Sequence, residues 1–159
     1  MKQSLTCLFI AAVVIGVIGW AEAQPAYGPS ITLEQAKKVM AGAEAEAKKN
    51  NWPVVIAILD SGGNIVLLQR LDDTQFGSIE VARQKAWSAV AYRRPSKVWQ
   101  DVVAGGGAGL RILKLEGAAP FDGGLPILVD GRIVGAVGVS GVTGEQDGQI
   151  AKAGVDALK

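Results

Sequence analysis

The chain has 159 residues, a formal net charge of +1, no histidine and a single cysteine, which lies near the N-terminus. Without histidine it cannot build a Ser-His-Asp triad or a histidine-ligated haem, and a structural zinc site of the usual nitrogen and sulfur type is also excluded. The balanced charge excludes a basic face for nucleic acid, and no metal site is predicted.

The first 23 residues have the pattern of a secretory signal peptide. Lys2 gives a basic start, residues 5–20 form an uncharged apolar run, and the sequence Ala-Glu-Ala at 21–23 is typical of a cleavage site. We expect cleavage after Ala23, export to the periplasm or the medium, and no stable membrane anchor afterwards. The apolar run is shorter than the roughly 20 residues of a membrane-spanning helix, although a retained anchor is the alternative.

The rest of the chain divides into a flexible lead-in, residues 24–30, and one domain, residues 31–159. Thr32 and Gln35 have the spacing of a capping box, and small or apolar residues follow at helical intervals. This pattern predicts a helix from Leu33 to about Lys49.

Two hairpins are predicted. In the first, residues 54–59 and 65–68 flank a glycine turn, and in the second, residues 127–139 enclose an Asp130-Gly131 turn. Because the two hairpins share one design, they predict a single antiparallel sheet of four or five strands.

Two helices are predicted between the hairpins. Ser78 is a candidate N-cap for the first, which ends before Pro95, and Ser96 opens a second, shorter helix. A glycine-rich run follows at 105–109; it lacks the lysine and Ser/Thr of a phosphate-binding loop and is interpreted as a flexible connector or lid. The expected fold is therefore α/β (α+β), with helices flanking the sheet. The apolar stripe of the first of these helices consists of Ile79, Ala82, Ala86, Ala89 and Val90.

Basic side chains of the middle helix are the first candidates for a site. Arg83 and Lys85 lie mid-helix, where no helix dipole attracts a base, so they either hold an anion or form a solvated face. Arg93 and Arg94 suit the negative end of that helix, with anion binding as the alternative.

A second group of candidates surrounds the start of the last predicted helix. Gly123 and Gly124 would let the backbone approach a ligand closely, and a helix N-terminus stabilises a carboxylate. Thr143 and Gln146 also have capping-box spacing, so a cap and an anion site are rival uses of the same atoms. Asp147 is a candidate ligand-facing group.

These motifs together carry a family resemblance. The chain resembles the GlcG/HbpS family of haem-degrading or haem-binding proteins in the sequences AILD at 57–60, SI at 78–79 leading to KA at 85–86, GGLPI at 123–127, GAVGVSG at 135–141 and QD at 146–147. The resemblance covers about residues 31–158. It implies a central antiparallel sheet flanked by helices, homo-oligomers that are often octamers, and extracellular haem binding or degradation in some members. Other relatives include glycolate-operon proteins, the C-terminal domain of some cobalamin adenosyltransferases, and cucumopine synthase.

The resemblance also bears on the ligation of haem iron. Members that hold haem through histidine are no guide here, because this chain has none. Ser88 stands where the family usually has a threonine, and its hydroxyl implies weak, non-histidine ligation. Lys85, Tyr92 and Tyr27 are alternative ligands, since tyrosinate ligates haem iron in some proteins.

The sequence therefore predicts a secreted or periplasmic homo-oligomer that binds a small ligand, with haem or a related tetrapyrrole first. One alternative is a cofactor-independent enzyme acting on a small hydroxy- or keto-carboxylate, with Lys85 or Asp147 as catalytic base. Another is an accessory oligomer. The predicted ligand-binding residues are Arg83, Ser88, Tyr92, Gly123, Gly124, Ser140 and Gln146.

Overall fold

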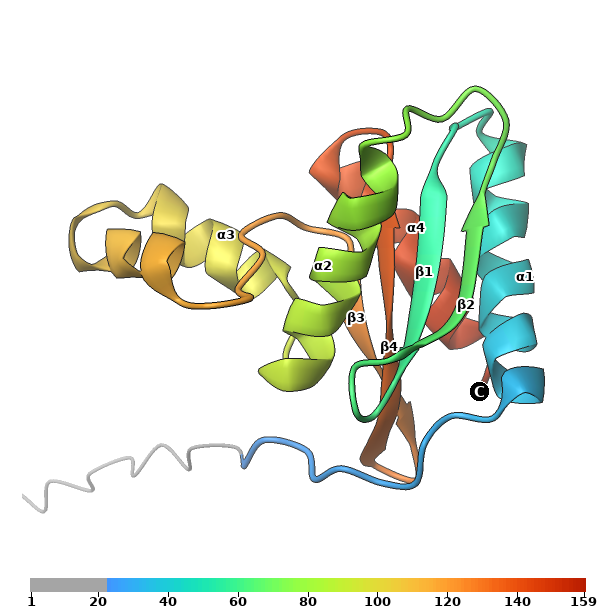
Figure 1. Ribbon diagram of the computed structural model, residues 1–159, viewed down its shortest axis with the longest axis horizontal. Helices are drawn as coiled ribbons and strands as arrows, with labels where there is room; N and C mark the ends of the chain where they lie inside the picture. Colours follow the sequence, from blue (N-terminus) through green and yellow to red (C-terminus); the bar gives the residue numbers. More distant parts are fainter. Residues whose placement is uncertain (1–22) are drawn as a thin grey trace, which may run out of the picture.

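The computed structural model describes residues 23–159, which form a four-stranded antiparallel sheet with helices on both faces (Figure 1). The strand order across the sheet is β2-β1-β4-β3. This confirms the α/β class and the single sheet, whereas all of the predicted signal peptide except Ala23 lies outside the described residues. The strands are β1 (Val55–Asp60), β2 (Ile65–Arg70), β3 (Gly124–Val129) and β4 (Arg132–Ser140).

The helices and the sheet form three layers (Figure 1). On one face lie α1 (Leu33–Lys49) and α4 (Gly144–Asp156), and on the other lies α2 (Ser78–Ala91). Because side chains alternate along a strand, Ile56 of β1 packs in the core with α1 and α4, and Ala57 packs against α2. No helix in residues 23–159 is long and apolar enough to cross a membrane.

Glycines let α2 lie close to the sheet. A Cβ atom at Gly138 of β4 would lie 2.0 Å from the carbonyl oxygen of Ala82. A Cβ atom at Gly124 of β3 would lie 2.3 Å from the carbonyl oxygen of Lys85. The close approach at Gly124 is therefore to α2 rather than to an open pocket.

The helix termini follow the sequence closely at α1 and less closely at α2. The capping box of α1 is confirmed: the Gln35 N–H donates to Thr32 Oγ1, and the Thr32 N–H donates to Gln35 Oε1. Two expectations for α2 are wrong. Its N-cap is Gly77 rather than Ser78, which is buried within the first turn, and Ile79 is 38% exposed and so lies outside the buried stripe.

An arm projects from the layered body between α2 and β3 (Figure 1). We define the arm as residues 97–121; it contains α3 (Lys97–Ala104) and a 3₁₀ helix, η1 (Gly107–Lys114), which pack on each other. The flexible connector expected at 105–109 is only two residues long, because η1 begins at Gly107. The φ angles of Gly106 and Gly107 are positive, at 65° and 52°. The sequence did not predict η1, so the arm was not foreseen.

The second half of the lead-in is attached to the sheet. The Gly28 N–H donates to the carbonyl of Ile133, and the Ile133 N–H donates to the carbonyl of Ala26. The Tyr27 hydroxyl donates to the carbonyl of Val90 at 2.8 Å, near the end of α2. The segment expected to be a flexible lead-in thus forms a short parallel bridge to β4.

Candidate functional site

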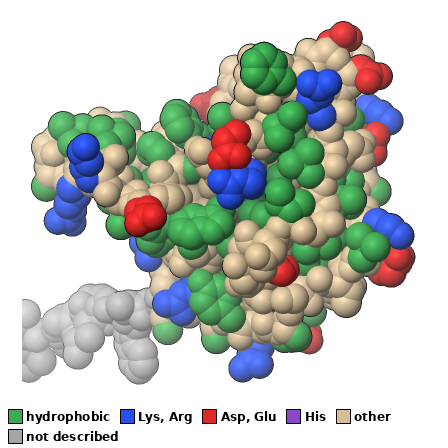
Figure 2. Space-filling model, in the orientation of Figure 1, with side chains coloured by type: hydrophobic (Ala, Val, Ile, Leu, Met, Phe, Trp, Pro, Cys, Tyr) green, Lys and Arg blue, Asp and Glu red, His purple; other side chains and the backbone are tan. Residues whose placement is uncertain are grey.

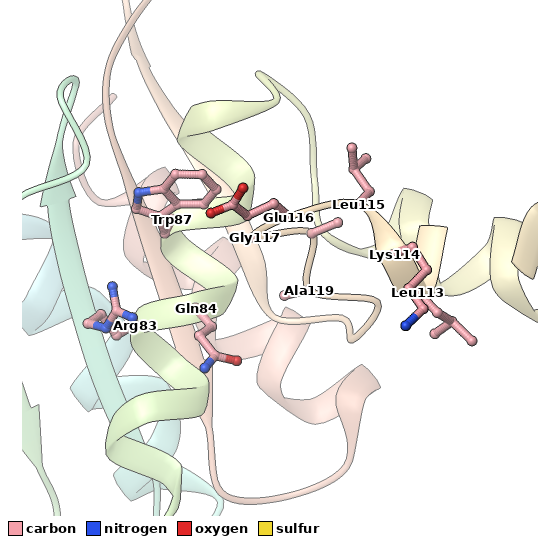
Figure 3. Close-up of a pocket in the computed structure, with 10 residues that line it drawn as sticks. Arg83, Gln84, Trp87, Leu113, Lys114, Leu115, Glu116, Gly117 and Ala119 are labelled. Atoms are coloured by element: carbon pink, nitrogen blue, oxygen red, sulfur yellow. The ribbon is translucent and has the colours of Figure 1, made fainter. Parts of the chain in front are cut away.

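A cleft of about 620 Å³ lies between α2 and the returning end of the arm (Figure 3). Its walls are formed by Arg83, Gln84 and Trp87 of α2 and by residues 113–119 of the arm. Pockets that bind small molecules typically have volumes of about 300–1,000 Å³. The cleft is therefore large enough for a sizeable organic ligand.

Two cations and one carboxylate face this cleft. Arg83 lies at the α2 side and Lys114 at the arm side, and the Glu116 carboxylate lies beside the ring of Trp87 (Figure 3). The Arg83 guanidinium donates to both oxygens of Glu80, at 2.6 and 2.9 Å, and this bonding lowers the pKa of Glu80 to about 2. Arg83 is therefore tethered by a carboxylate that stays ionised under ordinary conditions.

Trp87 gives the cleft a flat apolar wall. Its indole lies between two glycines of positive φ: a Cβ atom at Gly117 would lie 2.0 Å from the ring, and one at Gly63 would lie 3.1 Å from Nε1. The backbone of both glycines packs against the ring; a side chain at Gly117 would collide with it, and one at Gly63 would contact it tightly. A rigid indole face suits stacking of a planar ligand.

Residues 116–124 are tied to α2 and α3 by polar side chains. The Tyr92 hydroxyl donates to the carbonyl of Glu116, and the Ala119 N–H donates to Ser88 Oγ at 3.1 Å. Ser96 Oγ donates to the carbonyl of Phe121 at 2.6 Å. Ser88 is fully buried, and neither it nor Tyr92 is among the residues that line the cleft. These two predicted ligands hold the wall of the cleft in place.

Lys85 and Asp147, the two predicted bases, are paired with each other in the core. Lys85 Nζ donates to Asp147 Oδ2 at 2.7 Å and to the carbonyl of Val139 at 2.9 Å. Lys85 is 3% exposed and Asp147 is 2% exposed. Burial raises the pKa of Asp147, and the charge of Lys85 opposes that rise. The Val142 N–H donates to the other carboxylate oxygen at 3.3 Å.

The remaining predicted residues also have partners within the fold. Gly123 adjoins the buried pair, since a Cβ atom there would lie 3.1 Å from Lys85 Nζ. Ser140 Oγ lies 3.3 Å from Ser78 Oγ. Gln146 completes a capping box with Thr143, as its spacing predicted. Among the predicted ligand-binding residues, all of which lie in the described part of the chain, Arg83 is the one that lines the cleft.

The sequence missed Trp87 and the arm side of the cleft. Arg83 and Trp87 are four residues apart, so they share a helix face, and this spacing is the signal that could have found the α2 wall. No comparable signal marks residues 113–119, because their position depends on how the arm folds back.

Known proteins resemble the chain over nearly all of its described length. Residues 31–156 match a family model described as haem-degrading protein HbpS-like. GlcG of Escherichia coli is 39% identical over 110 residues, which is 69% of this chain and 81% of GlcG.

Solved structures share the fold. The crystal structure of a PduOC:haem complex has a TM-score of 0.73 and 33% identity, covering 80% of this chain and 94% of that one. The crystal structure of HbpS has a TM-score of 0.75 and 30% identity, covering 83% of this chain and 92% of that one. The family resemblance and the fold expected from the sequence are thereby confirmed.

Proposed function

The chain belongs to the family of haem-degrading HbpS-like proteins, and we propose that it binds a small ligand, with haem or a related tetrapyrrole as the leading candidate. The observation that carries the proposal is the cleft of about 620 Å³ between α2 and the arm. Its volume and its flat wall suit a planar ligand. The PduOC:haem complex supports a tetrapyrrole as the ligand class for this fold.

The chemistry of the cleft fits the ring and the carboxylates of a tetrapyrrole. Trp87 offers a face on which the ring can stack, and Leu113 and Leu115 of the arm add apolar contact. Arg83 and Lys114 can each attract a carboxylate, and a guanidinium does so through two parallel hydrogen bonds. The Glu116 carboxylate lies beside Trp87, so it repels the carboxylates of a ligand from that part of the cleft.

The same residues offer little to the iron of haem. The chain has no histidine, the Ser88 hydroxyl accepts a hydrogen bond from the Ala119 N–H, and the Tyr92 hydroxyl donates to Glu116. Lys85, the other candidate, is bonded to Asp147. We therefore propose that binding rests on the ring and its carboxylates, with weak iron ligation at most.

Export and assembly are further parts of the proposal. The signal-peptide pattern supports a secreted or periplasmic protein that begins at Gln24. The family resemblance supports a homo-oligomer, of which an octamer is the implied size.

The alternative of a cofactor-independent enzyme has less support. A general base must come within hydrogen-bond reach of its substrate. Lys85 and Asp147 are almost fully buried and bonded to each other, and the cleft is lined by other residues.

Titration of the mature chain with haemin and with iron-free protoporphyrin IX tests the proposal. Fluorescence quenching of tryptophan and the Soret band report binding. We expect both ligands to bind with dissociation constants within about tenfold of each other, because the iron adds little.

Variants of the cleft locate the binding. Arg83→Ala is expected to weaken binding by about tenfold or more, since a hydrogen bond to a charged group contributes about 1.5–3 kcal/mol. Trp87→Leu should weaken it as well, whereas Arg132→Ala, an exposed change in β4, should not. An absent Soret shift, or binding that ignores both cleft variants, would refute the proposal.

A further inference from the structure

A second cleft, of about 440 Å³, lies where the chain leaves α2 and passes the edge strand β3. We call it the arginine cleft. Two consecutive arginines, four apolar residues and the start of the lead-in line it; the arginines and apolar residues are Arg93, Arg94, Pro95, Leu125, Pro126 and Leu128. The cleft beside Trp87 is lined by other residues, so a ligand of the arginine cleft is independent of the proposed tetrapyrrole.

The two arginines carry positive charge that no carboxylate balances. Figure 2 shows several basic side chains directly beside acidic ones on the visible face. Arg93 and Arg94, by contrast, form no ion pair with any carboxylate of residues 23–159. Both side chains are half-buried. Because adjacent like charges repel each other, an anion that contacts both guanidinium groups is stabilised there.

Arg93 occupies a backbone position that usually belongs to glycine. Its N–H donates to the carbonyl of Val90, and the Arg94 N–H donates to the carbonyl of Ala89. These bonds form a Schellman motif, in which the residue after the C-cap has a positive φ and is most often glycine. The φ of Arg93 is 53°, a conformation that is unfavourable for a residue with a Cβ atom. Ending the helix therefore does not account for an arginine here, and strained residues of this kind often mark binding sites.

Aromatic rings hold both guanidinium groups in place. The guanidinium carbon of Arg94 lies 4.9 Å from the centroid of the Trp99 ring, and its Nε donates to the carbonyl of Tyr92 at 3.0 Å. The guanidinium carbon of Arg93 lies 5.8 Å from the centroid of the Tyr27 ring. A guanidinium stacked on a ring keeps the N–H donors at its edge available to an anion. The arginine cleft is thus organised for an anion before the anion binds.

The rest of the arginine cleft is apolar and aliphatic. Leu125, Pro126 and Leu128 of β3 line it, and the Leu128 side chain is 42% exposed. The rings of Tyr27 and Trp99 are not among its lining residues. The cleft therefore offers aliphatic contacts rather than a flat aromatic face to the body of a ligand.

We propose that the arginine cleft binds an aliphatic anion, whose head group accepts hydrogen bonds from Arg93 and Arg94 and whose chain lies along β3. A fatty acid and an alkyl phosphate share this chemistry, because a guanidinium binds a carboxylate or a phosphate through two parallel hydrogen bonds. The volume falls in the range of about 300–1,000 Å³ that is usual for small-molecule sites.

Isothermal titration calorimetry of the mature chain with hexanoate, octanoate and decanoate tests the site. The affinity is expected to rise by up to about fourfold for each methylene that is buried. Octylammonium has the same chain as octanoate with the opposite charge, and it should not bind. Octyl phosphate compared with octanoate separates the two sources of the head group, and the tighter of the two identifies it. Failure of both anions to bind, or equal binding of octylammonium, would overturn the inference.

Variants of the two arginines locate the head group. Arg94→Ala and Arg93→Gly are each expected to weaken octanoate binding by about tenfold or more, because each removes a charged hydrogen-bond donor. Arg70→Ala is the control for charge, since Arg70 is exposed at the end of β2, the opposite edge strand of the sheet. Unchanged binding in both arginine variants would contradict the assignment.

Arg93→Gly also separates a binding role from a structural one. Because glycine adopts a positive φ without strain, the melting temperature of this variant should be unchanged or higher while binding falls. Asn51→Gly is the matched control: Asn51 follows the C-cap of α1, has a φ of 55° and makes the same backbone bond. That variant should show the same thermal behaviour with unchanged octanoate affinity. A clear fall in the melting temperature of Arg93→Gly would assign Arg93 to the fold instead.

Protoporphyrin IX distinguishes this site from the one beside Trp87. Octanoate should bind equally well to the free chain and to the chain saturated with protoporphyrin IX, because the two clefts have no lining residue in common. Displacement of octanoate by protoporphyrin IX would overturn the inference of a separate site. Octanoate binding without any porphyrin binding would leave the arginine cleft standing and remove the tetrapyrrole proposal.

Discussion

Lys85 of α2 and Asp147 of α4 form a buried ion pair at 2.7 Å, although 62 residues separate them in the chain. Their helices pack on opposite faces of the sheet, so the pair joins the two outer layers. Gly123 leaves room for this link, because a Cβ atom there would lie 2.8 Å from the Cβ atom of Asp147. A pair of this kind contributes modestly to stability while intact and is costly to break.

Lys85→Met should reveal that cost. At pH 8 the variant is expected to lose about 3–5 kcal/mol of unfolding free energy, because the Asp147 carboxylate is left buried without its partner. Burial already raises the pKa of Asp147 above its ordinary value of 3.8, and removing Lys85 removes the charge that opposes this rise. When the folded-state pKa of a carboxyl lies above its unfolded-state pKa, the protein loses stability as the pH rises from the lower value to the higher one. The unfolding free energy lost by Lys85→Met should therefore be smaller at pH 4.5 than at pH 8.

Urea denaturation of the variant and the wild type at both pH values measures this difference. The double variant Lys85→Met/Asp147→Leu is the control, and it should recover most of the stability at pH 8 because no uncompensated charge remains. The account is wrong if the loss is the same at both pH values.

Gly138→Ala tests the close packing of α2 on the sheet. The new Cβ atom would lie 2.0 Å from the backbone oxygen of Ala82, so α2 must shift, and we expect a loss of about 1–3 kcal/mol or more. Gly77→Ala is the matched control, because no atom lies within 4 Å of its Cβ position and its φ is −59°. Because Gly77 is the N-cap of α2, where glycine is preferred to alanine, that variant should lose less than about 1 kcal/mol. Thermal unfolding distinguishes the two, and equal midpoints would contradict the packing argument.

Glu80→Gln should strengthen the binding of an anionic tetrapyrrole by releasing Arg83. Exposed ion pairs contribute about 0.2–1 kcal/mol, so the gain is expected to be at most about fivefold. Because Arg83 lowers the pKa of Glu80 to about 2, the carboxylate loses its charge, and its share of stability, only as the pH falls towards that value. The gain should therefore be the same at pH 6 and pH 8.

Fluorescence titration with protoporphyrin IX measures the gain. Glu34→Gln, which releases Lys37 on the surface of α1, is the control and should change nothing. Equal affinities for the two variants would show that Arg83 does not hold the ligand.

Thr143→Ala and Gln146→Ala test whether the start of α4 is a cap or a ligand site. The Gln146 N–H donates to Thr143 Oγ1, and the Thr143 N–H donates to Gln146 Oε1. Losing the N-cap hydroxyl is expected to lower stability by about 1 kcal/mol, as for Thr32→Ala at the equivalent position of α1. Porphyrin affinity should be unchanged in all three variants, and a selective loss of binding in Gln146→Ala would assign that side chain to the ligand.

Local features of this protein could be predicted from the sequence because nearby residues produce them. The Asp130-Gly131 turn is an example: its φ angles are 51° and 72°, and both must be positive for a two-residue hairpin of this kind. The arm could not be predicted in the same way, because η1 is only eight residues long and begins within a glycine-rich run, which is typical of a loop.

By itself the sequence determined the capping boxes of α1 and α4, the two hairpins, the α/β class and the absence of a histidine ligand for haem. These follow from composition and from contacts within a few residues. Only the tertiary structure decided that Lys85 pairs with Asp147, that Ser88 holds the wall of the cleft, and that the cleft lies against Trp87. Each of these contacts depends on how the helices pack on the sheet and how the arm folds back on α2. The packing and hydrogen bonds that stabilise them act between segments far apart in the chain.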